Sequence, residues 1–363
     1  MKPQMNTDKY GSASVCVHLW FRMLRPVGFR LLCFELLFFG LLTQHAGSGA
    51  YQGEDGEVRK LAEGVYVRIA AADQSIVSNA GFVELDNSVL VFDTHFTLEA
   101  GQSLLAAIQK ITTKPVRYLV NSHFHPDHTH GNQSFAGPVH IIATTNARRD
   151  VVQRDLPAMN RTLGIAQAQI EKMKKDLIAT KDPAQQAGLR AQIQQHQKFL
   201  DRMTGLKILP PVLGVEDSLD VNDTVRPARL LYLGKGHTDG DLVLYLPNEK
   251  IAFVGDLFFN SALPNTQDAF LLEWMRTLAE LLKLDAETFV PGHGPVGTKS
   301  EVKDFLKYLE ELKEWVEPRV TEGAAMEQVL RDVKLPPKYS SYSYQYFFPA
   351  NLQKMYSELR AAK

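Results

Sequence analysis

The sequence is poor in cysteine: its 363 residues include only two, Cys16 and Cys33, and both lie near the N-terminus. The rest of the chain therefore has no disulfide to hold it together, even in an oxidising compartment. Thiolate metal ligands are excluded there for the same reason. Any metal site after residue 33 must be built from His, Asp and Glu side chains.

A hydrophobic run long enough to span a membrane is lacking at the N-terminus. Residues 31–42 give an apolar stretch of about 12 residues, whereas a membrane helix needs about 20. Three arginines precede this stretch, and small residues including Ser48-Gly49-Ala50 follow it. This order predicts a cleaved secretory signal over residues 1–50, rather than a stable membrane anchor, and export to the periplasm or the extracellular space. A start at Met23 would give a more typical signal.

The chain also lacks a strong charge of either sign, with a formal net charge of −1. Removal of residues 1–50 takes away five basic and two acidic residues, which moves the net charge to −4. A mildly acidic chain without a run of basic residues offers no positively charged surface for binding nucleic acid. The expected partner is therefore a small-molecule substrate, while the oligomeric state is open.

Short apolar runs bounded by turn residues predict strands in two blocks. The first block comprises residues 65–69, 81–85 and 88–92, a helix with apolar positions from Leu98 to Ile111, and a strand over residues 116–120. The second comprises strands over residues 229–233, 242–246 and 251–254, a helix over about 270–284, and a short strand over 288–290. This alternation predicts an α/β fold.

A helical insertion is expected between the two blocks, over about residues 160–205. The segment is rich in Gln, Lys and Ala and is broken at Asp182-Pro183, which predicts two helices forming a hairpin. A lid, a partner-binding face, a dimer contact and a surface insertion packed on the domain are the alternatives for its role. The main domain would then cover residues 51–300, and residues 301–363 would form a helical extension packed on it.

The most informative pattern is His123-Phe-His125-Pro-Asp127-His128, which directly follows the predicted strand over residues 116–120. Zinc favours this mixture of nitrogen and oxygen ligands, and iron and manganese are alternatives. Four candidate ligands are more than a three-ligand catalytic site needs. The pattern therefore predicts two metal ions.

Three further candidates, His237, Asp256 and His293, each follow an apolar strand, where the loops of an α/β sheet converge on a site. Gly236 and Gly292 permit tight backbone geometry beside them. The predicted ligands are His123, His125 and His237 for the first ion and Asp127, His128 and His293 for the second, with Asp256 bridging the pair. A hydroxide between the ions would be the nucleophile, because metal lowers the pKa of bound water toward about 7.

The remaining histidines are weaker candidates. His130, beside the cluster, is either a hydrogen-bond partner of a ligand or a structural residue. His95, His140 and His196 have no ligand-like setting.

These residues resemble the metallo-β-lactamase fold superfamily. The resemblance covers about residues 57–300 in the correct order and rests on the His123–His128 motif together with Gly236-His237-Thr-Asp-Gly-Asp241, Val254-Gly-Asp256 and Pro291-Gly-His293-Gly. It implies a four-layer αβ/βα sandwich with a dinuclear metal site at one edge. It also implies hydrolysis of an ester, thioester, lactone or β-lactam, with Asp127 orienting the hydroxide.

Two departures from the β-lactamases argue against a β-lactam substrate. The subclass most similar in layout carries Cys where Asp256 stands, and a substrate-binding Lys where this chain has Phe259. An iron persulfide dioxygenase is an alternative of another class, but its mononuclear site would not need Asp127, His128 and His293. A binding module without catalysis would have lost a ligand, and a nuclease is disfavoured by the acidic charge.

Overall fold

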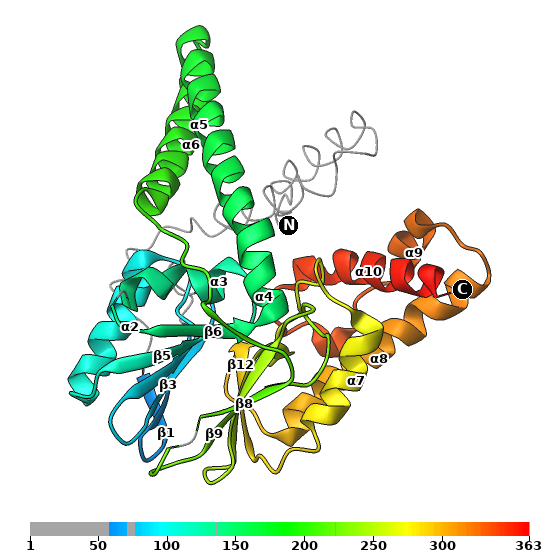
Figure 1. Ribbon diagram of the computed structural model, residues 1–363. Coiled ribbons are helices and arrows are strands. Elements are labelled where there is room, and N and C mark those ends of the chain that lie inside the picture. The colour runs from blue at the N-terminus through cyan, green and yellow to red at the C-terminus, as the bar shows by residue number, and fades with distance from the viewer. Residues whose placement is uncertain (1–57, 71–76, 136, 222, 363) are drawn as a thin grey trace, which may run out of the picture. The chain divides into compact units, whose positions relative to one another are not determined.

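The computed structural model describes residues 58–70, 77–135, 137–221 and 223–362 (Figure 1). The predicted signal segment and the alternative start at Met23 lie outside these residues. Within the described ranges, none of the helices combines the length and the apolar composition that a membrane span needs.

Two β-sheets form the centre of the fold (Figure 1). The first has seven strands, in spatial order β1 (Val58–Ala62), β2 (Val65–Arg68), β3 (Ala80–Glu84), β4 (Val89–Phe92), β5 (Val116–Val120), β6 (His140–Thr144) and β7 (Leu213–Val215). The second has five, in spatial order β12 (Thr288–His293), β11 (Ile251–Phe259), β10 (Leu242–Leu246), β9 (Ala228–Tyr232) and β8 (Ser218–Val221). Strands β4 to β7 pair in parallel, as do β11 and β12.

Helices cover the outer faces of both sheets and extend beyond them. They are α2 (Leu98–Ile111), α3 (Pro126–Thr129), α4 (Thr145–Asp150), α5 (Leu156–Ala179), α6 (Pro183–Met203), α7 (Leu271–Leu281), α8 (Lys299–Thr321), α9 (Met326–Asp332) and α10 (Phe348–Ala361). Short 3₁₀ turns lie at His130–Phe135, Pro337–Tyr339 and Gln345–Phe347, and a π-helical turn, η3, at Val151–Asp155.

Alternating side chains create the layers. Leu90 in β4 and Leu244 in β10 point into the core between the two sheets, because successive residues of a strand face opposite sides. Val91 points the other way, toward Leu104 of α2, while Val243 faces the core shared with α7 and α8. The result is a four-layer αβ/βα sandwich, which confirms the predicted fold class.

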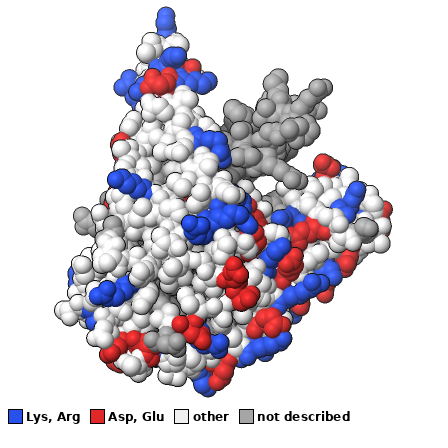
Figure 2. Space-filling model, in the orientation of Figure 1, with Lys and Arg blue, Asp and Glu red and all other residues white. Residues whose placement is uncertain are grey.

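Helices α5 and α6 form the hairpin, with α5 beginning earlier than the sequence pattern indicates, at Leu156. The hairpin rises away from the sheets, and charged side chains of both signs gather near its outer end (Figures 1 and 2). His196 Nε2 lies 2.9 Å from Gln169 Oε1 across the two helices. Ile178 near the tip is 86% exposed, so the outer half buries little apolar surface.

The C-terminal helices pack on the second sheet. Leu309 of α8 and Leu352 of α10 are buried in the same core as Trp274 of α7. The Glu358 carboxylate of α10 accepts hydrogen bonds from the backbone N–H groups of Leu271 (2.9 Å) and Leu272 (3.0 Å). This contact satisfies backbone donors at the start of α7, where Phe270 provides no side-chain cap.

Candidate metal centre

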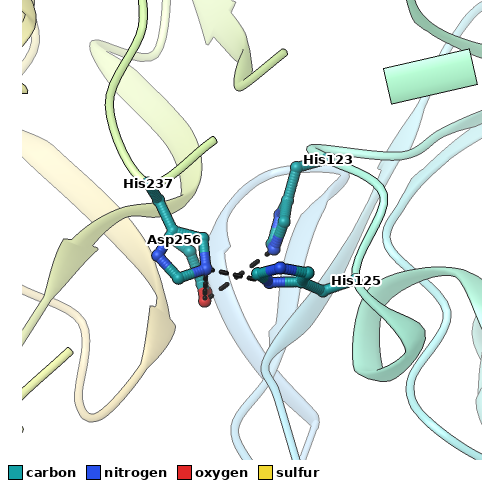
Figure 3. A group of neighbouring side chains, drawn as sticks. All are labelled: His123, His125, His237 and Asp256. Carbon is teal, nitrogen blue, oxygen red and sulfur yellow. Dashed lines mark hydrogen bonds and ion pairs between the residues drawn. The ribbon is translucent and has the colours of Figure 1, made fainter. Parts of the chain in front are cut away.

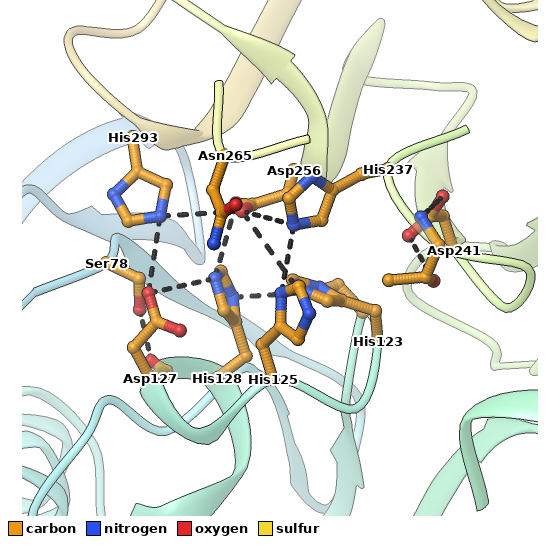
Figure 4. Close-up of polar contacts among 12 residues, drawn as sticks. Ser78, His123, His125, Asp127, His128, His237, Asp241, Asp256, Asn265 and His293 are labelled. Atoms are coloured by element: carbon orange, nitrogen blue, oxygen red, sulfur yellow. Dashed lines mark hydrogen bonds and ion pairs between the residues drawn. The ribbon is translucent and has the colours of Figure 1, made fainter. Parts of the chain in front are cut away.

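All seven predicted ligands lie together at one edge of the two sheets (Figure 4). They come from four places: the loop and short helix after β5, the loop after β9, the interior of β11, and the end of β12. Their donor atoms form two groups, within each of which the atoms lie within 4.8 Å of one another. The first group is His123, His125, His237 and Asp256, and the second is Asp127, His128 and His293.

The first group offers three nitrogens and one oxygen (Figure 3). His237 Nε2 lies 2.9 Å from His125 Nδ1 and 3.2 Å from Asp256 Oδ2. His123 Nε2 is 3.9 Å from the same Asp256 oxygen. Three imidazoles with one carboxylate suit a four-coordinate zinc ion.

The second group lies on the other side of Asp256. His293 Nε2 is 3.3 Å from Asp127 Oδ2, and His128 Nε2 is 3.5 Å from that atom. Asp256 Oδ1 approaches His128 Nε2 at 3.3 Å, while Asp256 Oδ2 faces His237. The same Oδ2 atom also lies 3.5 Å from His293 Nε2, so the Asp256 carboxylate contacts both groups.

Buried atoms at the centre indicate that a cation fits here. His123 Nε2, His128 Nε2 and Asp256 Oδ1 are buried and have no hydrogen-bond partner among the described residues. Burying such polar atoms without a partner is unfavourable. A metal ion between them would satisfy these nitrogen and oxygen atoms together, because each can act as a metal ligand.

The electrostatic environment favours the ligating forms of His123, His237 and Asp256. Burial lowers the pKa of His237 to about 3 and also lowers the pKa of His123, so both imidazoles are neutral at physiological pH. Burial opposes ionisation of Asp256, His128 and His293 alike, but their mutual attraction holds the pKa of the Asp256 carboxyl well below its usual range and the pKa values of both imidazoles well above theirs. His128 and His293 would therefore release their protons when metal binds. Neutral imidazole and ionised carboxylate are the forms that bind metal.

Two carboxylates behind the cluster orient its imidazoles. Asp268 Oδ2 lies 3.0 Å from His125 Nε2, which leaves His125 Nδ1 to face the centre. Asp93 Oδ2 lies 2.8 Å from His128 Nδ1, which leaves His128 Nε2 to face it. Ser122 Oγ donates to Asp93 and lies 2.9 Å from His123 Nδ1. Such partners set the ring orientation and raise ligand basicity.

Sequence reasoning missed both carboxylates. Asp93 directly follows a predicted strand, as several of the ligands do, and this position was a usable signal. Asp268 lies in the loop between β11 and α7, where no periodic pattern identifies it. Asn265 of the same loop also lies beside the cluster and was missed (Figure 4).

Two buried histidines of the described residues, outside the ligand set, have other partners. His130 Nε2 lies 3.1 Å from Asp155 Oδ2 in η3, and its ring stacks on Phe96. His95 Nδ1 lies 2.9 Å from the carbonyl oxygen of Ser78.

Close backbone approach explains the glycines beside His293. A Cβ atom at Gly292 would overlap the Asp256 carboxylate, and one at Gly294, where φ is +92°, would overlap the Asn260 carbonyl oxygen. Only glycine fits both positions without a shift of its neighbours.

Aromatic rings form one wall of the centre. Phe259 stacks on the His293 imidazole with ring centroids 5.2 Å apart, and Trp274 contacts the His237 ring at 5.5 Å. The Trp274 indole N–H donates to the Leu257 carbonyl oxygen, which fixes its orientation. An apolar ring therefore lies beside the second group.

Known proteins are similar to this chain in sequence. The chain is 24% identical over 284 residues to the linear primary-alkylsulfatase of Pseudomonas sp. (strain ATCC 19151), which covers 72% of this chain and 51% of that protein. It is 32% identical over 135 residues to the metallo-beta-lactamase type 2 of Bacteroides fragilis, covering 34% of this chain and 53% of that protein. This chain thus spans about half the length of these two relatives.

Solved structures show the same fold. The metallo-beta-lactamase from Pontibacter korlensis superposes with a TM-score of 0.52 at 20% identity, covering 70% of this chain and 99% of that one. The metallo-beta-lactamase from Erythrobacter litoralis gives a TM-score of 0.52 at 18% identity, covering 72% and 99%. The family model described as the Metallo-beta-lactamase superfamily matches residues 76–293, a segment that includes all seven clustered residues, so the chain belongs to this superfamily.

Proposed function

We propose that this protein is an exported two-zinc hydrolase that acts on a small ester, thioester, lactone or β-lactam. The observation that carries the proposal is the position of Asp256, whose carboxylate contacts His237 of the first group and His128 and His293 of the second. One group of ligands would be enough for a mononuclear site, so the second group supports a pair of ions.

His123, His125 and His237 would hold the first zinc ion, Asp127, His128 and His293 the second, and Asp256 would bridge them. Bound there, zinc supplies Lewis acidity, which lowers the pKa of a bound water toward about 7 and polarises a substrate oxygen.

Asp127 is the residue to which we assign proton transfer. Its contacts with His128 and His293 both use Oδ2, which leaves Oδ1 to accept a hydrogen bond from the attacking water. The Asp127 side chain is 15% exposed, more than Asp256 at 4%, so it is the more accessible of the two carboxylates. A carboxylate in that position orients the water and takes up its proton.

Phe259 bears on the choice of substrate. Its ring covers one face of His293, where a cation would be needed to pair with a substrate carboxylate. This contact favours a neutral ester, thioester or lactone over a β-lactam antibiotic. The similarity to an alkylsulfatase over 72% of the chain also makes a sulfate ester worth testing.

The test uses residues 51–363 and quantifies bound metal. We expect two zinc ions per chain and turnover of at least one compound from a panel of an ester, a lactone, a thioester, a β-lactam and an alkyl sulfate. Asp127→Asn should lower kcat by about 100-fold or more, because general acid–base catalysis contributes that much. His237→Ala should lower the zinc content toward about one ion per chain, because it removes a ligand.

His196→Ala is the matched control, because His196 lies on the hairpin and pairs with Gln169. It should leave both metal content and turnover unchanged. A single iron ion per chain, or activity that neither Asp127→Asn nor His237→Ala lowers, would refute the proposal.

A further inference from the structure

The C-terminal extension brings a tyrosine to the metal centre. The Tyr344 ring lies nearly perpendicular to the His293 imidazole, with a centroid distance of 5.8 Å and an interplanar angle of 87°. Tyr344 lies well beyond residues 76–293, which match the superfamily model. A segment outside the shared fold therefore contacts a predicted ligand of the second group.

The backbone around Tyr344 is tied to the strand that carries Asp256. The Ser343 N–H donates to the Ser261 carbonyl oxygen, and the Leu263 N–H donates to the Ser343 carbonyl oxygen, both at 2.9 Å. Residues Ser261 and Leu263 directly follow β11. These two bonds fix the position of the backbone next to Tyr344 relative to the strand that carries Asp256.

Tyr344 also has an unfavourable backbone conformation. Its φ is 60° and its ψ is 31°, in the left-handed region that bulky side chains rarely occupy. Such strain persists only where surrounding contacts impose it, and it is concentrated at functional sites.

The Tyr344 hydroxyl has no hydrogen-bond partner among the described residues, unlike the hydroxyls of Tyr308, Tyr339 and Tyr356. Tyr339 donates to Glu311, and Tyr356 donates to the Ala324 carbonyl oxygen. Tyr308 contacts the amide of Asn351. The hydroxyl of Tyr344 is therefore free to bind a ligand.

We propose that Tyr344 is a catalytic residue whose hydroxyl donates a hydrogen bond to the leaving-group oxygen of an ester or lactone beside His293. This inference rests on the proposed hydrolase function. The water oxygen bonds to the acyl carbon, and the bond from that carbon to the leaving oxygen breaks with its electron pair on the oxygen. That oxygen receives a proton from the attacking water, by way of Asp127, while Tyr344 keeps its own proton.

A preference between substrates follows from this geometry. An oxygen leaving group that gains negative charge is a strong hydrogen-bond acceptor, whereas sulfur is a weak one. Tyr344 should therefore assist oxygen esters and lactones much more than thioesters. Phe259 on the face of His293 adds an apolar surface but no hydrogen-bond donor.

The first test compares Tyr344→Phe with Tyr346→Phe, since Tyr346 is a neighbouring tyrosine that is 41% exposed. We expect Tyr344→Phe to lower kcat for an oxygen ester and a lactone by about 10- to 100-fold, the effect of losing a hydrogen bond to a charged group. Turnover of the matched thioester and the zinc content should change little, and Tyr346→Phe should match the wild type. Equal losses on ester and thioester, or equal losses in both variants, would overturn the inference.

The second test requires no turnover. Calorimetry on the zinc-loaded protein would measure binding of 4-hydroxybutyrate, a ring-opened lactone, and of butyrate, which lacks the hydroxyl. We expect Tyr344→Phe to weaken 4-hydroxybutyrate binding by about 10-fold, the scale of one hydrogen bond, and to leave butyrate binding unchanged. A wild-type protein without turnover but with this selective loss would contradict the hydrolase proposal and support the binding role of Tyr344. Equal effects on the two acids would overturn that role.

Discussion

The Nε2 atom of His125 lies 3.0 Å from Oδ2 of Asp268, although the two residues are 143 positions apart in the chain. Asp268 also forms an ion pair with Arg154 of η3, and the Arg154 guanidinium lies 4.5 Å from the centroid of the Phe124 ring. Burial opposes ionisation of Asp268, but His125 and Arg154 hold the pKa of this carboxyl well below its usual range. The π-helical turn at the base of the hairpin is thus connected to a predicted metal ligand.

Replacing Asp268 with Asn should weaken metal binding. The substitution keeps the size of the side chain but removes the charge that orients His125 and raises its basicity. We expect zinc affinity to fall by about 10- to 100-fold, measured by competition with a chelator. Asp285→Asn is the control, because the Asp285 side chain is 80% exposed. Similar affinities in both variants would show that Asp268 does not support the site.

Replacing Gly292 with Ala adds one methyl group and should disrupt metal binding at the centre. The new Cβ atom would overlap the Asp256 carboxylate, so Asp256 or the β12 backbone must move. We expect loss of bound zinc, measured by elemental analysis, and destabilisation of about 1–3 kcal/mol. Gly164→Ala in α5 meets no atom within 4 Å and should bind zinc normally. Full zinc content in Gly292→Ala would contradict the close packing at this strand end.

Replacing Glu358 with Gln should loosen the attachment of the C-terminal helices. The carboxylate accepts hydrogen bonds from two backbone N–H groups at the start of α7, and an amide has only one acceptor oxygen and no charge. We expect the free energy of unfolding to fall by about 0.5–2 kcal/mol, as for loss of a helix cap, measured with denaturant. Glu314→Gln, on the exposed side of α8, should have no effect. Equal stability of the two variants would rule out this capping role.

Shortening the hairpin tests its role. Residues 173–192 would be replaced by a short Gly–Ser linker, which retains the Gln169–His196 contact near the middle of the hairpin. The outer half of the hairpin buries little apolar surface. We therefore expect the free energy of unfolding to change by about 1 kcal/mol or less, and the bound metal to be retained. Loss of turnover with normal zinc content would identify the hairpin as a lid, and a change in mass by light scattering would identify it as a dimer contact.

The sequence by itself was enough to predict the fold class and the seven clustered residues. Alternating apolar positions in segments such as 88–92 and 242–246 encode which side of a strand is buried, and this pattern is local. The histidines follow strand ends directly, and the glycines beside them reflect a short-range steric need. All of these signals lie within a few residues of the feature that they predict.

Only the tertiary structure placed Asp268, Asn265 and Tyr344 beside the cluster. Each lies in an irregular segment whose sequence carries no periodicity, so its position depends on how distant elements pack. The loop after β11 brings Asp268 to His125, and pairing of Ser343 with that same loop brings Tyr344 to His293. Contacts between residues far apart in the chain form only when both sheets and the C-terminal helices have assembled. The local sequence pattern therefore does not predict them.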